Sequence, residues 1–286
     1  MSDINNLDDF DNIEDLRKEL EKRIKAHNED ITEDFEGLSP VEMHALHYDF
    51  PSKQSPLTLN TLPDKKLEQC PLLMQVRFLI DLMKGENTLQ LTKTGALNTK
   101  LVKDLYALGY LKSEWIENGR QKLYKESDAP TVSITRILLE LSSLTKKRHG
   151  KLSLTKKGEK LANDNNAILK ELISVLFKKF NWGYFDGFES DNIGAVNPAY
   201  SLYLLKKYGE EKRNTDFYAD RYFKAFPMLF TDGKNPYRCY AVRTFERYFR
   251  YLGLLKIQER KILDPYIIQK TPFLDALISY NLDDNS

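Results

Sequence analysis

The sequence predicts a helix-rich α+β fold in which one arrangement of helix and strand recurs. The segments KLSLTKKGEKLAN (151–163) and LQLTKTGAL (89–97) are near copies, and YIIQKTPFLDAL (266–277) is a looser echo. Leu152 and Leu154 alternate with polar residues, which is typical of a strand with one apolar face. Thr155 can cap the helix that follows. A chain of 286 residues that is 41% apolar can bury one large core or roughly two to three small ones.

The same order of elements appears twice in the second half of the chain. Residues 130–163 predict a helix, a basic turn (TKKRHG), a strand and a new helix, with His149-Gly150 making the turn. Residues 241–280 predict a helix, a strand, a turn, a second strand and a helix. We therefore expect a strand at 150–155 and another at 265–271, each in a short hairpin and each followed at once by a helix. This is the layout of a winged-helix unit.

An earlier, less regular copy precedes these two. Residues 91–111 predict a helix-turn-helix, followed by a hairpin over 110–127 that turns at Asn118-Gly119. The second helix, 98–108, is expected to bury Leu101, Val102, Leu105 and Leu108.

The N-terminal region predicts helices of its own. Residues 10–26 predict an amphipathic helix, and its apolar face should pack on the rest of the chain together with residues 27–60. That face consists of Ile13, Leu16, Leu20 and Ile24. Ser39-Pro40-Val41-Glu42 predicts the start of a helix that ends near Tyr48, and an extended linker to Leu62 should follow. Another helix is expected over 71–84.

These patterns predict three regions. The first, 1–62, is an acidic helical N-terminal region with a linker. The second, 63–165, is a basic region of helices and wings. The third, 166–286, is an aromatic helical segment that ends in a winged-helix-like unit. The expected fold is therefore α+β and helix-rich, with repeated winged-helix-like units.

Charge is unevenly distributed, although the formal net charge is only +1. Residues 1–90 carry 19 acidic and 10 basic side chains, residues 91–160 carry 7 and 15, and residues 161–286 carry 16 and 18. The acidic region is either a lid that docks on the basic middle or a differently solvated surface. The small net charge gives no overall attraction to nucleic acid or to a membrane.

Several classes of protein lack support in the sequence. No apolar run reaches roughly 18 residues, so we expect no membrane partner. The acidic N-terminus lacks an apolar signal core, which predicts a cytoplasmic protein. Cys70 and Cys239 have no partner spacing and are expected to be reduced core residues. Gly-rich phosphate loops and common hydrolase motifs are absent, so we expect no cofactor and no enzymatic activity.

Two resemblances extend this interpretation. The junction Leu154-Thr155-Lys156-Lys157-Gly158 resembles the step from wing to last helix in MarR-like and PadR-like winged-helix regulators. Residues 33–210 also resemble a family of uncharacterised bacterial proteins, through FEGLSPVEMHALHYDF, LTKTGAL, LSLTKKG and FNWGYFDGF. Some members carry SEC-C motifs or a plasmid open-reading-frame domain, and this chain has no Cys-rich SEC-C tail. The second resemblance implies no activity.

Two other segments carry candidate chemistry. In EMHALHYD, His44 and His47 are three residues apart on a predicted helix and could meet one metal with Glu42 or Asp49. With only four histidines and no third ligand at a telling distance, we expect no metal site. The segment 181–200 crowds aromatic residues among glycines. It is either a pocket for a base or a loop held to the core by its rings.

The strongest functional signal is basic. On a helical wheel, Val242, Phe245, Phe249 and Leu252 form one face of the last long helix. An arginine stripe, Arg243, Arg247 and Arg250, lies on the other face and is predicted to contact DNA phosphates or bases. At the other wing, the same role is predicted for Lys146, Lys147, Arg148 and Lys151.

The predicted function is that of a non-enzymatic DNA-binding or regulatory protein with duplex DNA as partner. The alternatives are a scaffold whose winged helices bind another protein, and a metal-dependent enzyme around His44 and His47.

Overall fold

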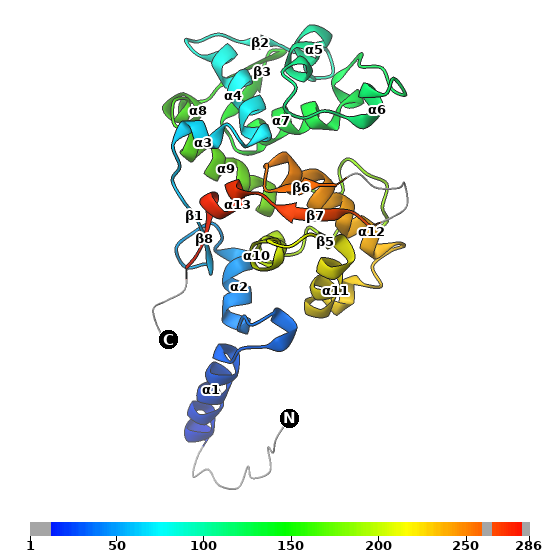
Figure 1. Cartoon of the computed structure of the whole chain (residues 1–286). Helices are drawn as coiled ribbons and strands as arrows, with labels where there is room; N and C mark the ends of the chain where they lie inside the picture. The colour runs from blue at the N-terminus through cyan, green and yellow to red at the C-terminus, as the bar shows by residue number, and fades with distance from the viewer. Residues whose placement is uncertain (1–12, 259–264, 282–286) are drawn as a thin grey trace.

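The computed structural model describes residues 13–258 and 265–281. Many helices alternate with short strands, so the predicted helix-rich α+β class is confirmed. The elements form two lobes with helix α9 between them, and helix α1 projects away from the body (Figure 1). The buried apolar residues of both lobes form one continuous cluster.

The N-terminal region contributes two anchors to the body. Helix α2 starts as its sequence predicts, because Ser39 and Glu42 exchange hydrogen bonds in a capping box. Strand β1 pairs antiparallel with strand β8 near the other end of the chain. The elements here are α1 (Ile13–Glu29), the short helix η2 (Glu33–Phe35), α2 (Pro40–Tyr48), β1 (Leu57–Leu59), α3 (Asp64–Leu67) and β8 (Ile278–Tyr280).

Helix α1 differs from the expectation. The prediction that its apolar face packs on the rest of the chain is wrong, because no residue of α1 is buried. Ile13 is 73% exposed and Ile24 is 57% exposed. Residues 38–57, by contrast, bury Leu38, Leu46 and Phe50 in the body. Nothing in the described chain covers the α1 stripe.

The first lobe is built around a three-stranded sheet in the order β2-β4-β3. The predicted hairpin is confirmed: β3 pairs with β4 from Thr145 opposite Leu154 to Arg148 opposite Lys151. His149 and Gly150 both have positive φ, 49° and 70°, as a two-residue hairpin turn requires. The elements are α4 (Pro71–Met83), β2 (Leu89–Gln90), α5 (Thr99–Ala107), α6 (Glu114–Glu117), η3 (Glu126–Asp128), α7 (Pro130–Leu141), β3 (Thr145–Arg148), β4 (Lys151–Leu154) and α8 (Lys156–Leu161).

The second lobe has the same order of main elements, and its sheet has the corresponding order β5-β7-β6. The predicted strand at 265–271 is confirmed as β7, which pairs antiparallel with β6 and leads directly into α13. The elements are α10 (Pro198–Tyr208), β5 (Arg213–Asn214), α11 (Thr215–Ala225), η4 (Pro227–Leu229), α12 (Pro236–Ala241), η5 (Val242–Phe249), β6 (Leu255–Ile257), β7 (Ile267–Lys270) and α13 (Pro272–Leu277). Helix α9 (Asn165–Lys178) connects the lobes and packs on α4 and α7.

Corresponding junctions in the two lobes are built from the same residues. Asn98 caps α5 after β2, and Asn214 caps α11 after β5. Thr155 caps α8 and donates its hydroxyl to the Ser143 carbonyl at 2.7 Å. Thr271 caps α13 and donates to the Gly253 carbonyl at 2.8 Å. Ser143 and Gly253 both have positive φ, so the backbone turns in the same way before each hairpin.

Replacing either threonine by Ala should lower stability by a similar amount. Thr155→Ala and Thr271→Ala each remove a helix cap and a hydrogen bond to a backbone carbonyl, which predicts a loss of about 1–2 kcal/mol. Urea denaturation measures it. Serine at either position keeps the hydroxyl and should recover most of the loss. A large difference between the two sites would contradict their equivalence.

Two details of the first lobe differ from the prediction. No strand forms over 110–127; Asn118 and Gly119 instead end the short helix α6, with Gly119 at φ 74°. Residues 91–97 form a turn closed by a bridge between Leu91 and Leu97, so the predicted helix-turn-helix has only its second helix, α5. Three of the four apolar residues predicted to be buried there are buried, and Leu108 is 37% exposed.

Candidate nucleic-acid interface

The β3–β4 hairpin presents a basic edge to solvent. Its apolar side faces inward through Leu152 and Leu154, which are buried. Lys146, Lys147 and Arg148 follow one another along β3, and all three are exposed. Lys151 is exposed directly after the turn. Because β3 is an edge strand of its sheet, no neighbouring strand covers these side chains.

The charges of this hairpin are largely unneutralised. Lys147 lies 3.4 Å from Glu140, and both side chains are partly exposed, so that ion pair is weak. Lys146, Arg148 and Lys151 form no ion pair with any residue between 13 and 258 or 265 and 281. The predicted basic site on the first lobe therefore lies on the surface, as a phosphate contact requires. We call Lys146, Lys147, Arg148 and Lys151 the basic wing.

The arginine stripe of the second lobe is arranged differently. Arg243 is fully buried, and its guanidinium binds both carboxylate oxygens of Asp186 at 2.8 and 3.0 Å. Arg247 binds the same carboxylate at 3.0 Å and donates to the Phe185 carbonyl. The prediction that the stripe faces nucleic acid is wrong for Arg243, because this side chain is buried. The Arg247 side chain is only 18% exposed, because it packs against the loop that contains Asp186. Arg250 is half-buried beside Tyr251.

The loop that carries Asp186 explains this error. Residues 242–249 form a π-helix, and Arg243 and Arg247, four positions apart, lie on the side that this loop covers. Arg243 and Arg247 therefore reach one acid together. Burial, the largest single effect, lowers the pKa of Arg243, but hydrogen bonding to Asp186 together with the electrostatic effects of Cys239, Asp186 and Tyr248 raises that pKa above its ordinary value. Arg243 is a structural cation.

The aromatic loop over 181–197 is held to the core rather than open. Trp182 is 1% exposed, donates to the Leu176 carbonyl and packs against Tyr248 with ring centroids 4.4 Å apart. The Ile193 carbonyl accepts from Arg243. Of the two interpretations of this segment, attachment to the core describes most of it. Tyr184, at 64% exposure, is the exception.

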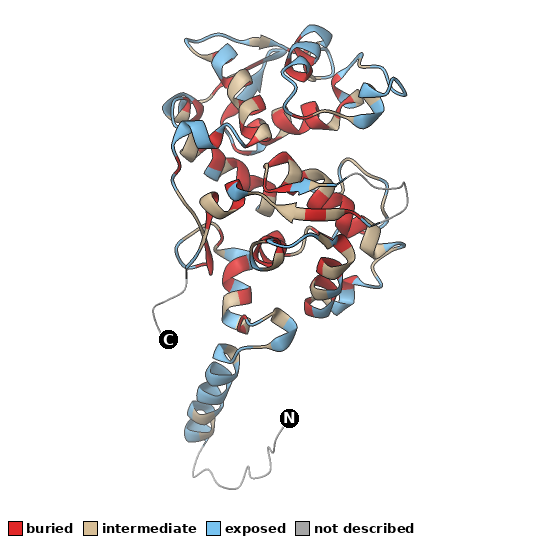
Figure 2. Cartoon of the chain, viewed as in Figure 1, coloured by how far each residue is buried: buried red, intermediate tan, exposed pale blue. Residues whose placement is uncertain are grey.

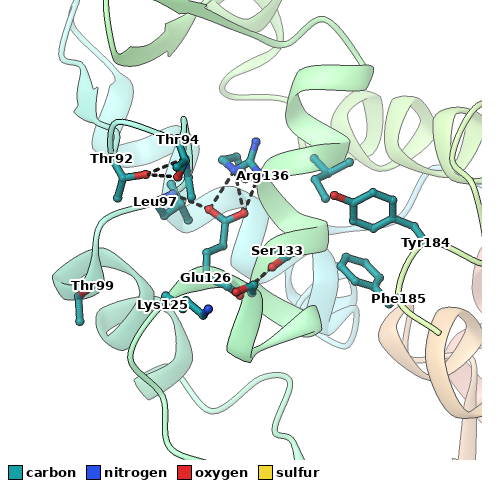
Figure 3. Close-up of a pocket in the computed structure, with 13 residues that line it drawn as sticks. Thr92, Thr94, Leu97, Thr99, Lys125, Glu126, Ser133, Arg136, Tyr184 and Phe185 are labelled. Carbon is teal, nitrogen blue, oxygen red and sulfur yellow. Dashed lines mark hydrogen bonds and ion pairs between the residues drawn. The ribbon is translucent and has the colours of Figure 1, made fainter. Parts of the chain in front are cut away.

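A pocket of about 330 Å³ lies where this loop meets the first lobe (Figure 3). Thr92, Thr94 and Ser133 line it together with Tyr184 and Phe185. Arg136 also borders the pocket, but its charge is not available to a ligand. Its guanidinium pairs with buried Glu126 at 2.7 Å and with Glu140 at 2.6 Å.

Helix α7 precedes the basic wing, and it does not present a basic surface either. It buries most of its length, including Val132, Ile134 and Leu138. Arg136 is its one basic residue and is neutralised by the two glutamates. Neither α7 nor η5 therefore exposes a basic face that could read a groove, whereas the basic wing is accessible.

The alternative metal site is not assembled among the described residues. Glu42 is committed to the capping box with Ser39. His44 and His47 are largely exposed, and their rings contact that of Tyr48 in tilted and edge-on arrangements, with centroids 4.5 and 4.4 Å apart. Burial lowers the pKa of His47, with smaller contributions from His44 and Lys178. Within residues 13–258 and 265–281, no group of three or more His, Cys, Asp and Glu residues could hold a metal ion.

Comparison with known proteins adds one similarity. Residues 68–167 match the family model of the Y4jL N-terminal domain. This match starts just before α4 and ends at the start of α9, so it covers the first lobe with the basic wing. No curated protein and no solved structure matches the chain. In the described part of the chain, every helix is too short or too polar to cross a bilayer.

Proposed function

We propose that this chain is a non-enzymatic nucleic-acid-binding protein with two winged-helix units, and that its basic wing contacts DNA phosphates. The shared element order supports the two units: helix, strand, helix, helix, hairpin, with the first strand next to the last. The matched asparagine and threonine caps support an origin by duplication. Two such units with a common origin would extend the resemblance to winged-helix regulators from the LT-x-x-G junction to both lobes.

The exposed charge of the basic wing carries the proposal. Three of its four cations form no ion pair within the described chain, and the fourth has only a weak one. Cations held on a hairpin can displace the counterions that surround DNA. In the second lobe, Arg243 and Arg247 on the third helix are neutralised by Asp186, so the two units would differ in role. The first would bind, and the second would support the fold.

Binding through the basic wing favours contacts to DNA phosphates over recognition of base edges. Phosphate contacts fix the position of a protein on the duplex but carry no sequence information. Sequence is read by side chains that enter a groove, and the third helix of each unit is covered here. We therefore expect affinity for mixed-sequence duplex DNA that depends strongly on salt.

The test replaces all four wing residues by alanine. Lys146→Ala, Lys147→Ala, Arg148→Ala and Lys151→Ala together should weaken binding to a mixed-sequence duplex. The slope of log affinity against log salt should flatten by about 0.9 per lost phosphate contact, up to about 3.6. Fluorescence anisotropy over a salt series measures both. Thermal stability should hardly change, because the four side chains are exposed.

A matched variant controls for net charge. Replacing Lys53, Lys179, Lys212 and Lys234 by alanine removes the same charge from exposed positions outside the first lobe. It should leave the salt slope unchanged. Equal effects of the two variants, or no DNA binding by the unmodified chain, would reject the proposal and favour the alternative, a scaffold that binds protein.

A further inference from the structure

Helix α1 carries an apolar stripe that the rest of the described chain leaves uncovered. Ile13, Leu16, Leu20 and Ile24 lie within about 80° of one another around the helix. Leu20 is 42% exposed, and Ile13 and Ile24 are more exposed still. The whole of α1 is coloured as exposed or intermediate (Figure 2).

Such a helix needs a partner for stability. A helix of 17 residues is only marginally stable alone in water, and most helical stability in proteins comes from packing of the apolar face. The exposed ion pair of Arg23 with Glu19 adds little. The stripe is narrow and runs the length of the helix, which suits another helix of similar length.

The charges on one flank of the stripe are complementary between two antiparallel copies. That flank carries Arg17 and Glu21. In an antiparallel helix pair, each flank meets the same flank of the partner, so Arg17 of one helix lies near Glu21 of the other. Overlaying the stripe on itself in this direction places Ile13 opposite Ile24 and Leu16 opposite Leu20.

The ends of the helix favour the antiparallel direction. The first turn of α1 carries the acidic residues Glu14 and Asp15, which a parallel pair would place beside the same residues of the partner. An antiparallel pair instead brings Glu14 and Asp15 level with Lys22 and Arg23 of the partner. The antiparallel arrangement also places the two helix dipoles in opposite directions.

We propose that α1 binds α1 of a second copy of this chain as an antiparallel helix pair. The dimer is formed by the stripe, and the bodies of the two copies need not touch. This proposal does not depend on nucleic-acid binding.

The first experiment measures mass by sedimentation equilibrium over a concentration series. The unmodified chain should approach twice its 33.4 kDa. Leu20→Glu with Ile24→Glu places charges on the stripe and should give a monomer. Lys18→Gln with Lys25→Gln makes the same change in net charge on exposed positions of the opposite face of α1 and should still dimerise. Because no residue of α1 is buried, all variants should keep the urea midpoint of the body.

A disulfide experiment fixes the direction. Cys70 and Cys239 are fully buried, and burial raises the pKa of both thiols to about 12, so an added surface cysteine reacts alone. Chains with Ile13→Cys and tagged chains with Ile24→Cys are mixed and oxidised. Mixed disulfides without same-residue disulfides are expected. A monomeric chain, a dimer that survives Leu20→Glu with Ile24→Glu, or same-residue disulfides alone would each overturn the proposal.

Discussion

Replacing Asp186 by Asn should destabilise the folded chain by about 3–5 kcal/mol, because it leaves a buried cation without its acid. The Asp186 side chain is 5% exposed and holds both Arg243 and Arg247. Asn keeps the size of the side chain but removes the charge. Arg243 remains charged, and only the neutral Ile193 carbonyl and the single amide oxygen of the new Asn can accept its hydrogen bonds. The midpoint of urea denaturation should fall, with an unchanged slope.

The nearby Asp191 provides the matched control for this prediction. Asp191 is exposed five residues along the same loop, and Asp191→Asn should change stability by less than about 0.5 kcal/mol. Equal effects of the two substitutions would contradict the structural role of the Asp186 pair. Adding Arg243→Met to Asp186→Asn should cost less than the sum of the single changes, because it removes the unpaired charge.

Local signals in the sequence were sufficient for several junctions. The capping box at Ser39 and Glu42 and the turn at His149 and Gly150 depend on residues within four positions of each other. So does the Thr155 cap. Each of these motifs satisfies its own backbone groups, and the structure confirms all three.

The same local signal can also have two meanings. Asn118-Gly119 is typical of a hairpin turn, but a glycine with positive φ equally ends a helix. Here it ends α6, because the preceding residues Glu114–Glu117 form a helical turn rather than a strand. Whether Asn118-Gly119 makes a hairpin turn or ends a helix depends on whether a partner strand is present, and the local sequence does not specify such a partner.

Long-range pairing explains the remaining differences. Asp186 lies 57 residues from Arg243, and nothing in the spacing of either residue indicates the other. Strands β2 and β5 have two residues each, too few to show an alternating pattern. The helical wheel predicted the apolar face of η5 correctly, but it could not show that the Asp186 loop packs on the opposite face and buries Arg243.

The glycine of the LT-x-x-G motif has a steric reason that the sequence alone did not reveal. Gly158 is the third residue of α8, and its amide donates to the Thr155 hydroxyl at 3.0 Å. A Cβ atom at this position would lie 2.0 Å from the carbonyl oxygen of Leu144. That oxygen cannot easily move away, because it accepts hydrogen bonds from the Thr155 amide and hydroxyl.

Gly158→Ala should therefore destabilise the chain by about 2–3 kcal/mol, in the upper part of the usual range for overpacking. The added methyl group must push α8 away from the hairpin, which breaks the Thr155 cap or the bonds to Leu144. Gly187→Ala is the control, since a Cβ there meets no atom within 4 Å, and it should be neutral or slightly stabilising. Urea denaturation of both variants tests the prediction. If Gly158→Ala is as stable as Gly187→Ala, close contact between α8 and the start of the basic hairpin is not what requires glycine in this motif.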